Sequence, residues 1–192
     1  MPRPSQRDAI VRAYVDHVVT HGPDAVTLEA VATRAGVSKG GLLYHFGSKD
    51  ALLTGFLDWV RELTRADITA AREVAAAGEE SVARYYLRTS ADDPHRDSAM
   101  FRSTVALLSL AGSEEAAAVT ARELMAAWRD VLAAEAGDEF TGDLIAALGD
   151  GIYLRAIAGE PSTALARDWD AVLARLSPLA GAARRAGRPG RR

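Results

Sequence analysis

Apolar residues recur at helical spacing along most of the 192-residue chain, and no stretch alternates apolar and polar positions as a half-buried strand does. The first apolar face spans residues 10–19. Ser5 and Asp8 stand ahead of it at the spacing of a capping box, which begins a helix, and Gly22 with Pro23 ends it. The pattern predicts an all-α fold of about nine helices and no sheet.

Small polar residues precede the next three apolar stripes. Thr27, Ser38 and Ser48 each suit an N-cap, and Gly36 suits the left-handed residue that ends a helix. We therefore expect a helix after Thr27, a short helix after Ser38, and a long helix from Ser48 to about residue 77. The first two helices and their turn have the spacing of a helix-turn-helix, whose second helix enters the major groove of DNA.

Further apolar segments predict helices around residues 85–87, 100–110, 124–132 and 144–157. Ser162 is the expected N-cap of a last helix. Residues 184–192 are only Arg, Gly, Pro and Ala, a composition typical of disorder. We expect a disordered, Arg-rich tail over 181–192, which either adds nonspecific affinity for phosphates or is a solvated terminus.

The formal net charge of −3 is distributed unevenly along the chain. Residues 1–55 carry a net charge of +1, residues 56–180 a net charge of −9, and the last twelve residues a net charge of +5. Because a negative surface repels a polyanion, a surface that approaches phosphates is expected in the first part of the chain.

The helix-turn-helix segment carries a specific motif. Residues 27–32 are TLEAVA and residues 35–53 are AGVSKGGLLYHFGSKDALL. Over residues 5–55 the chain resembles the N-terminal domain of TetR-family transcriptional regulators. The resemblance implies a helix-turn-helix DNA-binding domain over 1–47 and a larger helical effector-binding and dimerisation domain over 48–180.

This resemblance implies a function as well as a fold. We expect a cytoplasmic, bacterial, homodimeric transcription regulator that binds double-stranded DNA at a palindromic operator. It is interpreted as a repressor that a small, largely apolar effector releases from DNA. A transcriptional activator, or a ligand-independent helical protein that binds DNA or other partners, is the alternative.

The resemblance also assigns DNA contacts to individual residues. They are Thr27, Ser38, Lys39, Gly40, Gly41, Leu43, Tyr44, His45 and Lys49. Lys39 is the candidate for a guanine edge, because an ammonium suits the O6 and N7 acceptors. Lys49 opposes the dipole of its helix unless a phosphate lies near. Many family members have Tyr where this chain has Leu43, so Leu43 either touches a thymine methyl or packs inward.

The apolar segment 98–110 is expected to be enclosed on several sides, because it is apolar almost all round. Either it lines an effector pocket together with aromatic side chains of neighbouring helices, or it belongs to an ordinary packed core. The residues of the candidate pocket are Trp59, Leu63, Tyr86, Met100, Phe101, Thr104, Val105, Leu108, Met125 and Trp128.

Two apolar helices near the C-terminus are expected to form the dimer interface, since each is apolar on more than one side. The candidate residues are Leu144, Ile145, Leu148, Ile152, Tyr153, Trp169, Val172, Leu173 and Leu176. Gly149 and Gly151 lie inside one of these helices, where a close approach between helices would explain them.

The sequence contains few features typical of an enzyme or of a membrane protein. The chain holds no cysteine, which excludes disulfides, thiolate catalysis and cysteine-ligated metals. His17 and His21 have a metal-ligand spacing but lack a third ligand, and no phosphate-binding loop or nucleophile elbow is present. No apolar run is long enough for a membrane span, and no signal peptide is evident. We therefore expect no catalytic residues, no metal and no cofactor.

Overall fold

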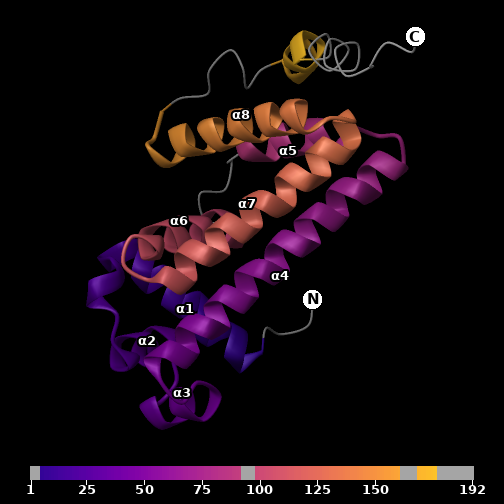
Figure 1. Ribbon diagram of the computed structural model, residues 1–192. Coiled ribbons are helices and arrows are strands. Elements are labelled where there is room, and N and C mark those ends of the chain that lie inside the picture. The colour runs from indigo at the N-terminus through magenta and orange to yellow at the C-terminus, as the bar shows by residue number, and fades with distance from the viewer. Residues whose placement is uncertain (1–4, 92–97, 161–167, 177–192) are drawn as a thin grey trace, which may run out of the picture. The chain divides into compact units, whose positions relative to one another are not determined.

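The computed structural model describes residues 5–91, 98–160 and 168–176 (Figure 1). These residues form helices, turns and bends and contain no strand, which confirms the all-α prediction. The helices are α1 (Gln6–His21), the 3-10 turn η1 (Pro23–Ala25), α2 (Leu28–Ala35), α3 (Lys39–His45), α4 (Lys49–Ala76), α5 (Val82–Ala91), α6 (Ala99–Ala111), α7 (Glu115–Ala136) and α8 (Glu139–Ile157). Residues 169–176 are helical as well.

Side-chain caps begin the first four helices at the predicted positions. The Ser5 hydroxyl and the Asp8 carboxylate form the capping box of α1. The hydroxyls of Thr27, Ser38 and Ser48 each accept a hydrogen bond from the backbone N–H three residues later, at 3.0–3.1 Å. Each cap satisfies an amide that the helix itself leaves unpaired, so the helix starts are fixed locally by sequence.

The chain divides into two compact units. Unit 1 comprises Met1–Arg65 and Arg96–Glu123, and unit 2 comprises Ala66–His95 and Leu124–Arg192. The division falls inside the long helices α4 and α7, and in each of them the first part belongs to unit 1 and the remainder to unit 2. The boundary expected at residue 47 separates a DNA-binding domain from an effector-binding domain. It therefore does not coincide with the boundary between the two compact units.

Helix α1 is the centre of unit 1. It packs against α2, η1 and α6, and its side chains Ile10, Val11 and Tyr14 are almost fully buried. An ion pair joins α6 to α1, because Nε of Arg102 lies 2.6 Å from Oδ1 of Asp16. Helix α6 is thus attached to the first helix of the helix-turn-helix segment.

The expected enclosure of α6 is wrong at its outer face. Leu108 is 39% exposed and Ser109 is exposed too, so a face of α6 is open within the described chain. The hydroxyls of Ser103, Thr104 and Ser109 donate to carbonyls one turn earlier in the same helix. Local bonds therefore satisfy these hydroxyls, which makes an apolar-looking helix compatible with a partly exposed position.

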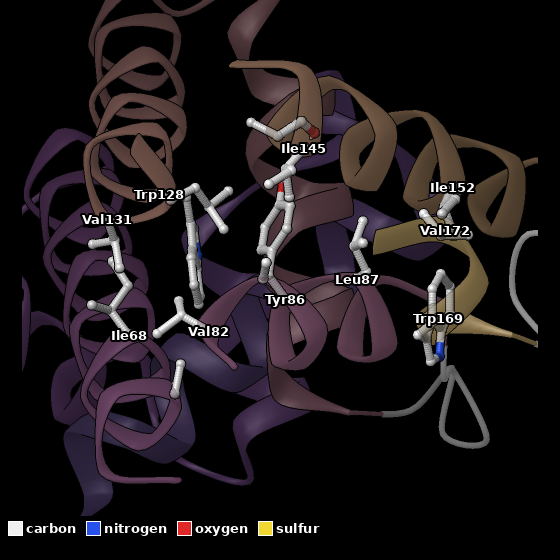
Figure 2. Packing of buried hydrophobic residues seen from close by; sticks show 14 residues of the cluster. Ile68, Val82, Tyr86, Leu87, Trp128, Val131, Ile145, Ile152, Trp169 and Val172 are labelled. Atoms are coloured by element: carbon white, nitrogen blue, oxygen red, sulfur yellow. Dashed lines mark hydrogen bonds between the residues drawn. The ribbon is translucent and has the colours of Figure 1, made fainter. Parts of the chain in front are cut away.

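Unit 2 contains an apolar cluster to which α4, α5, α7, α8 and residues 169–176 contribute (Figure 2). Helix α5 packs along α8, and the ring of Tyr86 lies 4.8 Å from the ring of Trp128 between centroids. A Cβ on Gly149 would lie 2.3 Å from the Tyr86 ring, so this glycine lets α5 and α8 approach. A Cβ on Gly151 would meet nothing within 4 Å in the same chain.

Other predicted features fall outside the described residues. The N-cap assigned to Ser162 and the Arg-rich tail over 181–192 are among them. Among the helices that the structure does describe, none combines the length and the hydropathy that crossing a bilayer requires.

Candidate nucleic-acid interface

The turn between α2 and α3 holds the two helices at a fixed angle. Gly36 ends α2 with φ +68°, a left-handed conformation that glycine adopts without strain. The N–H of Val37 donates to the carbonyl of Ala32 at 3.0 Å, which closes the turn. Leu42 of α3 is fully buried. The inner face of α3 therefore packs in the core of unit 1.

Phe46 connects α3 to two other helices. This residue caps the C-terminus of α3 and is 3% exposed. A Cβ on Gly55 of α4 would lie 2.4 Å from the Phe46 ring, so the ring sits directly on the α4 backbone. The guanidinium of Arg7, on α1, stacks over the same ring at 5.0 Å. The sequence pattern did not predict the contacts of Phe46 with Gly55 and Arg7. A glycine inside a helix and an arginine on an exposed face do not by themselves indicate a contact.

The opposite face of the motif is open to solvent. Thr27, Ser38, Lys39, Gly40, Leu43, Tyr44 and Lys49 are exposed, while Gly41 and His45 are half-buried. Tyr44 is 86% exposed, an unusual position for a large aromatic side chain. The nine residues expected to contact DNA therefore lie on α3 and at the starts of α2 and α4, and seven of them are exposed within the described chain.

Lys39 and His45 on this surface contact side chains of α2 and α1. The ammonium of Lys39 forms an ion pair with the Glu29 carboxylate, across the turn from α3 to α2. The hydrogen bond and the charge of Lys39 lower the pKa of Glu29. Nε2–H of His45 donates to Oε1 of Gln6 at 3.1 Å, which ties the end of α3 to α1. Neither Glu29 nor Gln6 was singled out by the sequence pattern.

The arrangement suits the backbone and base edges of a DNA duplex. Lys39 and Lys49 supply cations, Tyr44 and Ser38 supply hydroxyls, and the starts of α3 and α4 supply amide dipoles that favour anions. Gly40 adds no side chain near the start of α3, which leaves the helix backbone accessible. An exposed short helix with these groups has the dimensions and polarity of a major-groove recognition helix.

The candidate pocket residues are spread over both units. Trp59 and Leu63 lie on the α4 part of unit 1, and Met100, Phe101, Thr104, Val105 and Leu108 lie on α6 of the same unit. Tyr86, Met125 and Trp128 belong to unit 2. The structure brings Tyr86 and Trp128 into ring contact, whereas Met125 is 43% exposed and Trp59 carries the guanidinium of Arg12 on its ring. The pocket stays a prediction.

The candidate dimer residues are mostly occupied inside one chain. Ile145, Ile152, Trp169 and Val172 belong to the buried cluster of unit 2, and Leu144, Leu148, Tyr153, Leu173 and Leu176 are half-buried. A different stripe of α8 is apolar and open. It contains Phe140 and Leu154, 64% and 63% exposed, with Ala147 and Gly151 between them. The sequence could have indicated this stripe, because its apolar and small residues recur at spacings of three and four residues.

The histidine pair has a structural role at its first member. His17 is buried, and its Nε2–H donates to the carbonyl of Ala25 at 3.0 Å, which fixes the end of η1 against α1. The His21 ring lies 4.7 Å away between centroids. Among the described residues, no group of three or more potential ligands gathers around a point where a metal ion would fit.

Two protein-family models match the chain. The model for bacterial regulatory proteins of the tetR family matches residues 15–55, and the model for a tetracyclin repressor-like C-terminal domain matches residues 80–181. The HTH-type transcriptional regulator RutR of Escherichia coli is 36% identical over 92 residues. Those residues are 47% of this chain and 43% of RutR, so the chain matches less than half the length of that relative.

Solved structures share the fold over most of the chain. A putative transcriptional regulator from Streptomyces coelicolor is 27% identical with a TM-score of 0.66, and the match covers 91% of this chain and 99% of that one. A putative TetR-family regulator from Rhodococcus sp. is 25% identical with a TM-score of 0.68, over 91% and 98%. The multidrug binding protein EbrR, complexed with ethidium, is 25% identical with a TM-score of 0.64, over 90% and 98%.

Proposed function

The chain belongs to the tetR family of bacterial regulatory proteins, and from that premise we propose that it is a homodimeric, ligand-responsive repressor of transcription. Its helix-turn-helix makes it a DNA-binding transcriptional regulator and not an enzyme. The proposal adds three finer statements: the protein binds a palindromic operator, two copies assemble to do so, and a small, largely apolar effector releases them.

The observation that carries the proposal is the division of α3 into two faces. Leu42 is fully buried, whereas Tyr44, two residues later, is 86% exposed. The exposed side chains of Tyr44 and Lys39 on α3 contribute little to folding. Binding of another molecule at this face accounts for their exposure. A duplex fits this surface because the cations and the helix N-termini all favour phosphates.

Selection of bound fragments from a random duplex pool tests the DNA-binding part. We expect a palindromic consensus whose half-sites are about one helical turn, roughly 34 Å, apart. Tyr44→Ala and Lys39→Ala should abolish binding of the enriched duplex and leave the thermal unfolding midpoint unchanged, because both side chains are exposed. Arg122→Ala, an exposed residue of α7, is the matched control. Loss of folding in the α3 variants, or binding as tight as wild type, would contradict the assignment.

The dimer is assigned to the outer face of α8. Phe140, Leu144, Ala147, Gly151 and Leu154 follow one another at spacings of four, three, four and three residues, which places them on one stripe. The small residues at its centre suit close contact with the same helix of a second copy. Leu154→Glu should convert dimers to monomers in sedimentation equilibrium, and Val119→Glu, another exposed apolar position, should not. A monomeric wild-type protein would refute this assembly.

Effector response is the remaining part. The related EbrR is a multidrug binding protein crystallised with ethidium, and unit 2 of this chain has an aromatic pair, Tyr86 and Trp128, in its apolar cluster. We infer that an apolar effector binds in the C-terminal part, shifts α4, and thereby changes the separation of the two recognition helices. Such coupling typically amounts to about 1–3 kcal/mol.

Release of a labelled operator duplex tests the effector response. Ethidium and a panel of lipophilic compounds are added to the protein–duplex complex, and tryptophan fluorescence is recorded in parallel without DNA, because ethidium itself intercalates. An effector should quench fluorescence in wild type, quench less in Trp128→Phe, and lower the affinity for the duplex about 5- to 150-fold. Compounds that quench fluorescence without affecting the duplex would favour the ligand-independent alternative.

A further inference from the structure

Helices α2 and α3 and the turn between them contain one acidic side chain. Glu29 is the single acidic residue between Asp24 and Asp50, and its carboxylate pairs with the ammonium of Lys39. Both side chains are well exposed, at 62% for Glu29 and 54% for Lys39. A carboxylate beside a phosphate-binding surface weakens binding to any polyanion, so its position there calls for a physical reason.

Folding stability does not supply that reason. Exposed ion pairs typically contribute about 0–1 kcal/mol, and salt at physiological concentration screens them over about 8 Å. The turn between α2 and α3 is already fixed by Gly36 and by the hydrogen bond from Val37 to Ala32. The Glu29–Lys39 pair therefore adds little to the fold that these backbone features do not already provide.

The chemistry of an ammonium group offers a better reason. A lysine ammonium has three N–H donors on a flexible four-carbon stem, and a guanine edge presents two acceptors, O6 and N7. One donor held by Glu29 leaves two donors for those acceptors. Without the carboxylate, the same stem lets the ammonium move to a phosphate oxygen, which carries no sequence information.

We propose that Glu29 is a positioning and specificity-determining residue of the DNA-binding surface. Its carboxylate holds the Lys39 ammonium toward the base edges, and its charge disfavours duplexes to which Lys39 makes only phosphate contacts. The inference rests on the proposed binding of operator DNA and adds to it a second residue that determines the choice of sequence. Glu29 acts through Lys39 and touches no base itself.

Replacing Glu29 by glutamine removes the charge and keeps the size of the side chain. Nonoperator DNA, which is bound through its phosphates, should then be bound about 3- to 10-fold more tightly, with a salt dependence steeper by about one unit of slope. Operator affinity should stay the same or fall, because the ammonium is no longer held toward the bases. The ratio of operator to nonoperator affinity combines both effects, and it should fall at least threefold.

The experiment compares four proteins: wild type, Glu29→Gln, Lys39→Met and the double variant. The probes are a duplex that wild type enriches from a random pool and a scrambled duplex of the same length and composition. Affinities are measured by fluorescence anisotropy at several salt concentrations. Glu62→Gln is the matched control, because Glu62 is also exposed and paired with an arginine, Arg65, but lies on α4 about 20 Å along the helix from Lys49.

The measured affinities either support or overturn the role proposed for Glu29. The inference is supported by a lower ratio in Glu29→Gln and an unchanged ratio in Glu62→Gln. It also requires that Lys39→Met and the double variant bind the scrambled duplex with equal affinity. Equal gains for both duplexes, or equal effects of Glu29→Gln and Glu62→Gln, overturn it while leaving operator binding intact, since only net charge would then matter. Failure of wild type to enrich any duplex overturns the proposed function, and the inference with it.

Discussion

At the scale of single residues, the cations of the helix-turn-helix segment occupy positions that folding alone disfavours. Lys49 is the first residue of α4 and Lys39 the first residue of α3, where each helix dipole presents its positive end. Lys39 forms an ion pair with Glu29, which contributes little to folding because both side chains are exposed. Lys49 forms no ion pair within the described chain, so a phosphate is the partner that best accounts for its position.

Lys49→Ala should weaken binding to every duplex by a similar factor, because a phosphate contact carries no sequence information. The plot of log affinity against log salt concentration should become shallower by about 0.9. Arg72→Ala, an exposed cation further along α4, is the control and should leave the slope unchanged. A selective loss for the operator alone would instead place Lys49 at a base edge.

Tyr14 connects a buried hydroxyl to alkaline stability. Burial, and secondarily the charge of Glu114, raise the pKa of Tyr14 from its usual 10.0 to about 12. Between pH 10 and pH 12 the unfolded chain therefore releases a proton that the folded chain keeps, so the free energy of unfolding falls as the pH rises. Tyr14→Phe should make the urea midpoint less dependent on pH in this range. Parallel curves for the two proteins would contradict the assignment.

At the scale of elements, backbone contact between helices depends on glycine. A Cβ on Gly142 of α8 would lie 2.6 Å from both Cα and N of Ala133 on α7, atoms that cannot rotate away. The side chain of Glu135 adds a second link, because it accepts the N–H groups of Val82 and Ala83 at 2.7 and 2.8 Å and so caps α5 from a neighbouring helix.

Gly142→Ala should lower the free energy of unfolding by about 2–3 kcal/mol, since α7 and α8 must separate to admit the methyl group. Gly40→Ala provides the comparison, because its Cβ would meet only the Ser38 hydroxyl, at 3.9 Å. That variant should gain up to about 1 kcal/mol from helix propensity. Chemical unfolding in the absence of DNA measures both, and equal effects would show that packing at Gly142 is not tight.

The helix starts were predictable from sequence because each N-cap acts within four residues. Thr27, Ser38 and Ser48 illustrate this, and so does Gly36 with its left-handed conformation. Contacts between distant segments were not predictable, since nothing near Gly55 or Glu29 in the sequence marks Phe46 or Lys39 as a partner. The exposed stripe on α8 was missed for a related reason, because the more hydrophobic side of that helix faces its own core.

At the scale of the whole molecule, charge and assembly act together. The net charge of +1 over residues 1–55 contrasts with −9 over residues 56–180. This distribution favours contact of a polyanion with residues 1–55 over contact with residues 56–180. A single recognition helix contacts only a few base pairs, so two copies are needed for a palindromic operator to be distinguished from other DNA.

The monomeric variant Leu154→Glu tests this link between assembly and DNA binding. It should bind a duplex with one half-site as well as wild type does, because α3 is unaltered. On the full palindrome it should lose the gain that comes from two linked contacts, about 10²- to 10⁴-fold. Anisotropy titrations with one-half-site and two-half-site duplexes measure both affinities. Equal losses on the two duplexes would mean that the substitution disturbs α3.

The most direct test of DNA binding through α3 is titration of the selected duplex with wild type and with Tyr44→Ala, at low salt and at equal folded concentration. We expect a saturable complex with two protein chains per palindrome for wild type and no complex with the selected duplex for the variant. An unaltered affinity and preference in Tyr44→Ala would show that the exposed face of α3 is not the surface that contacts DNA.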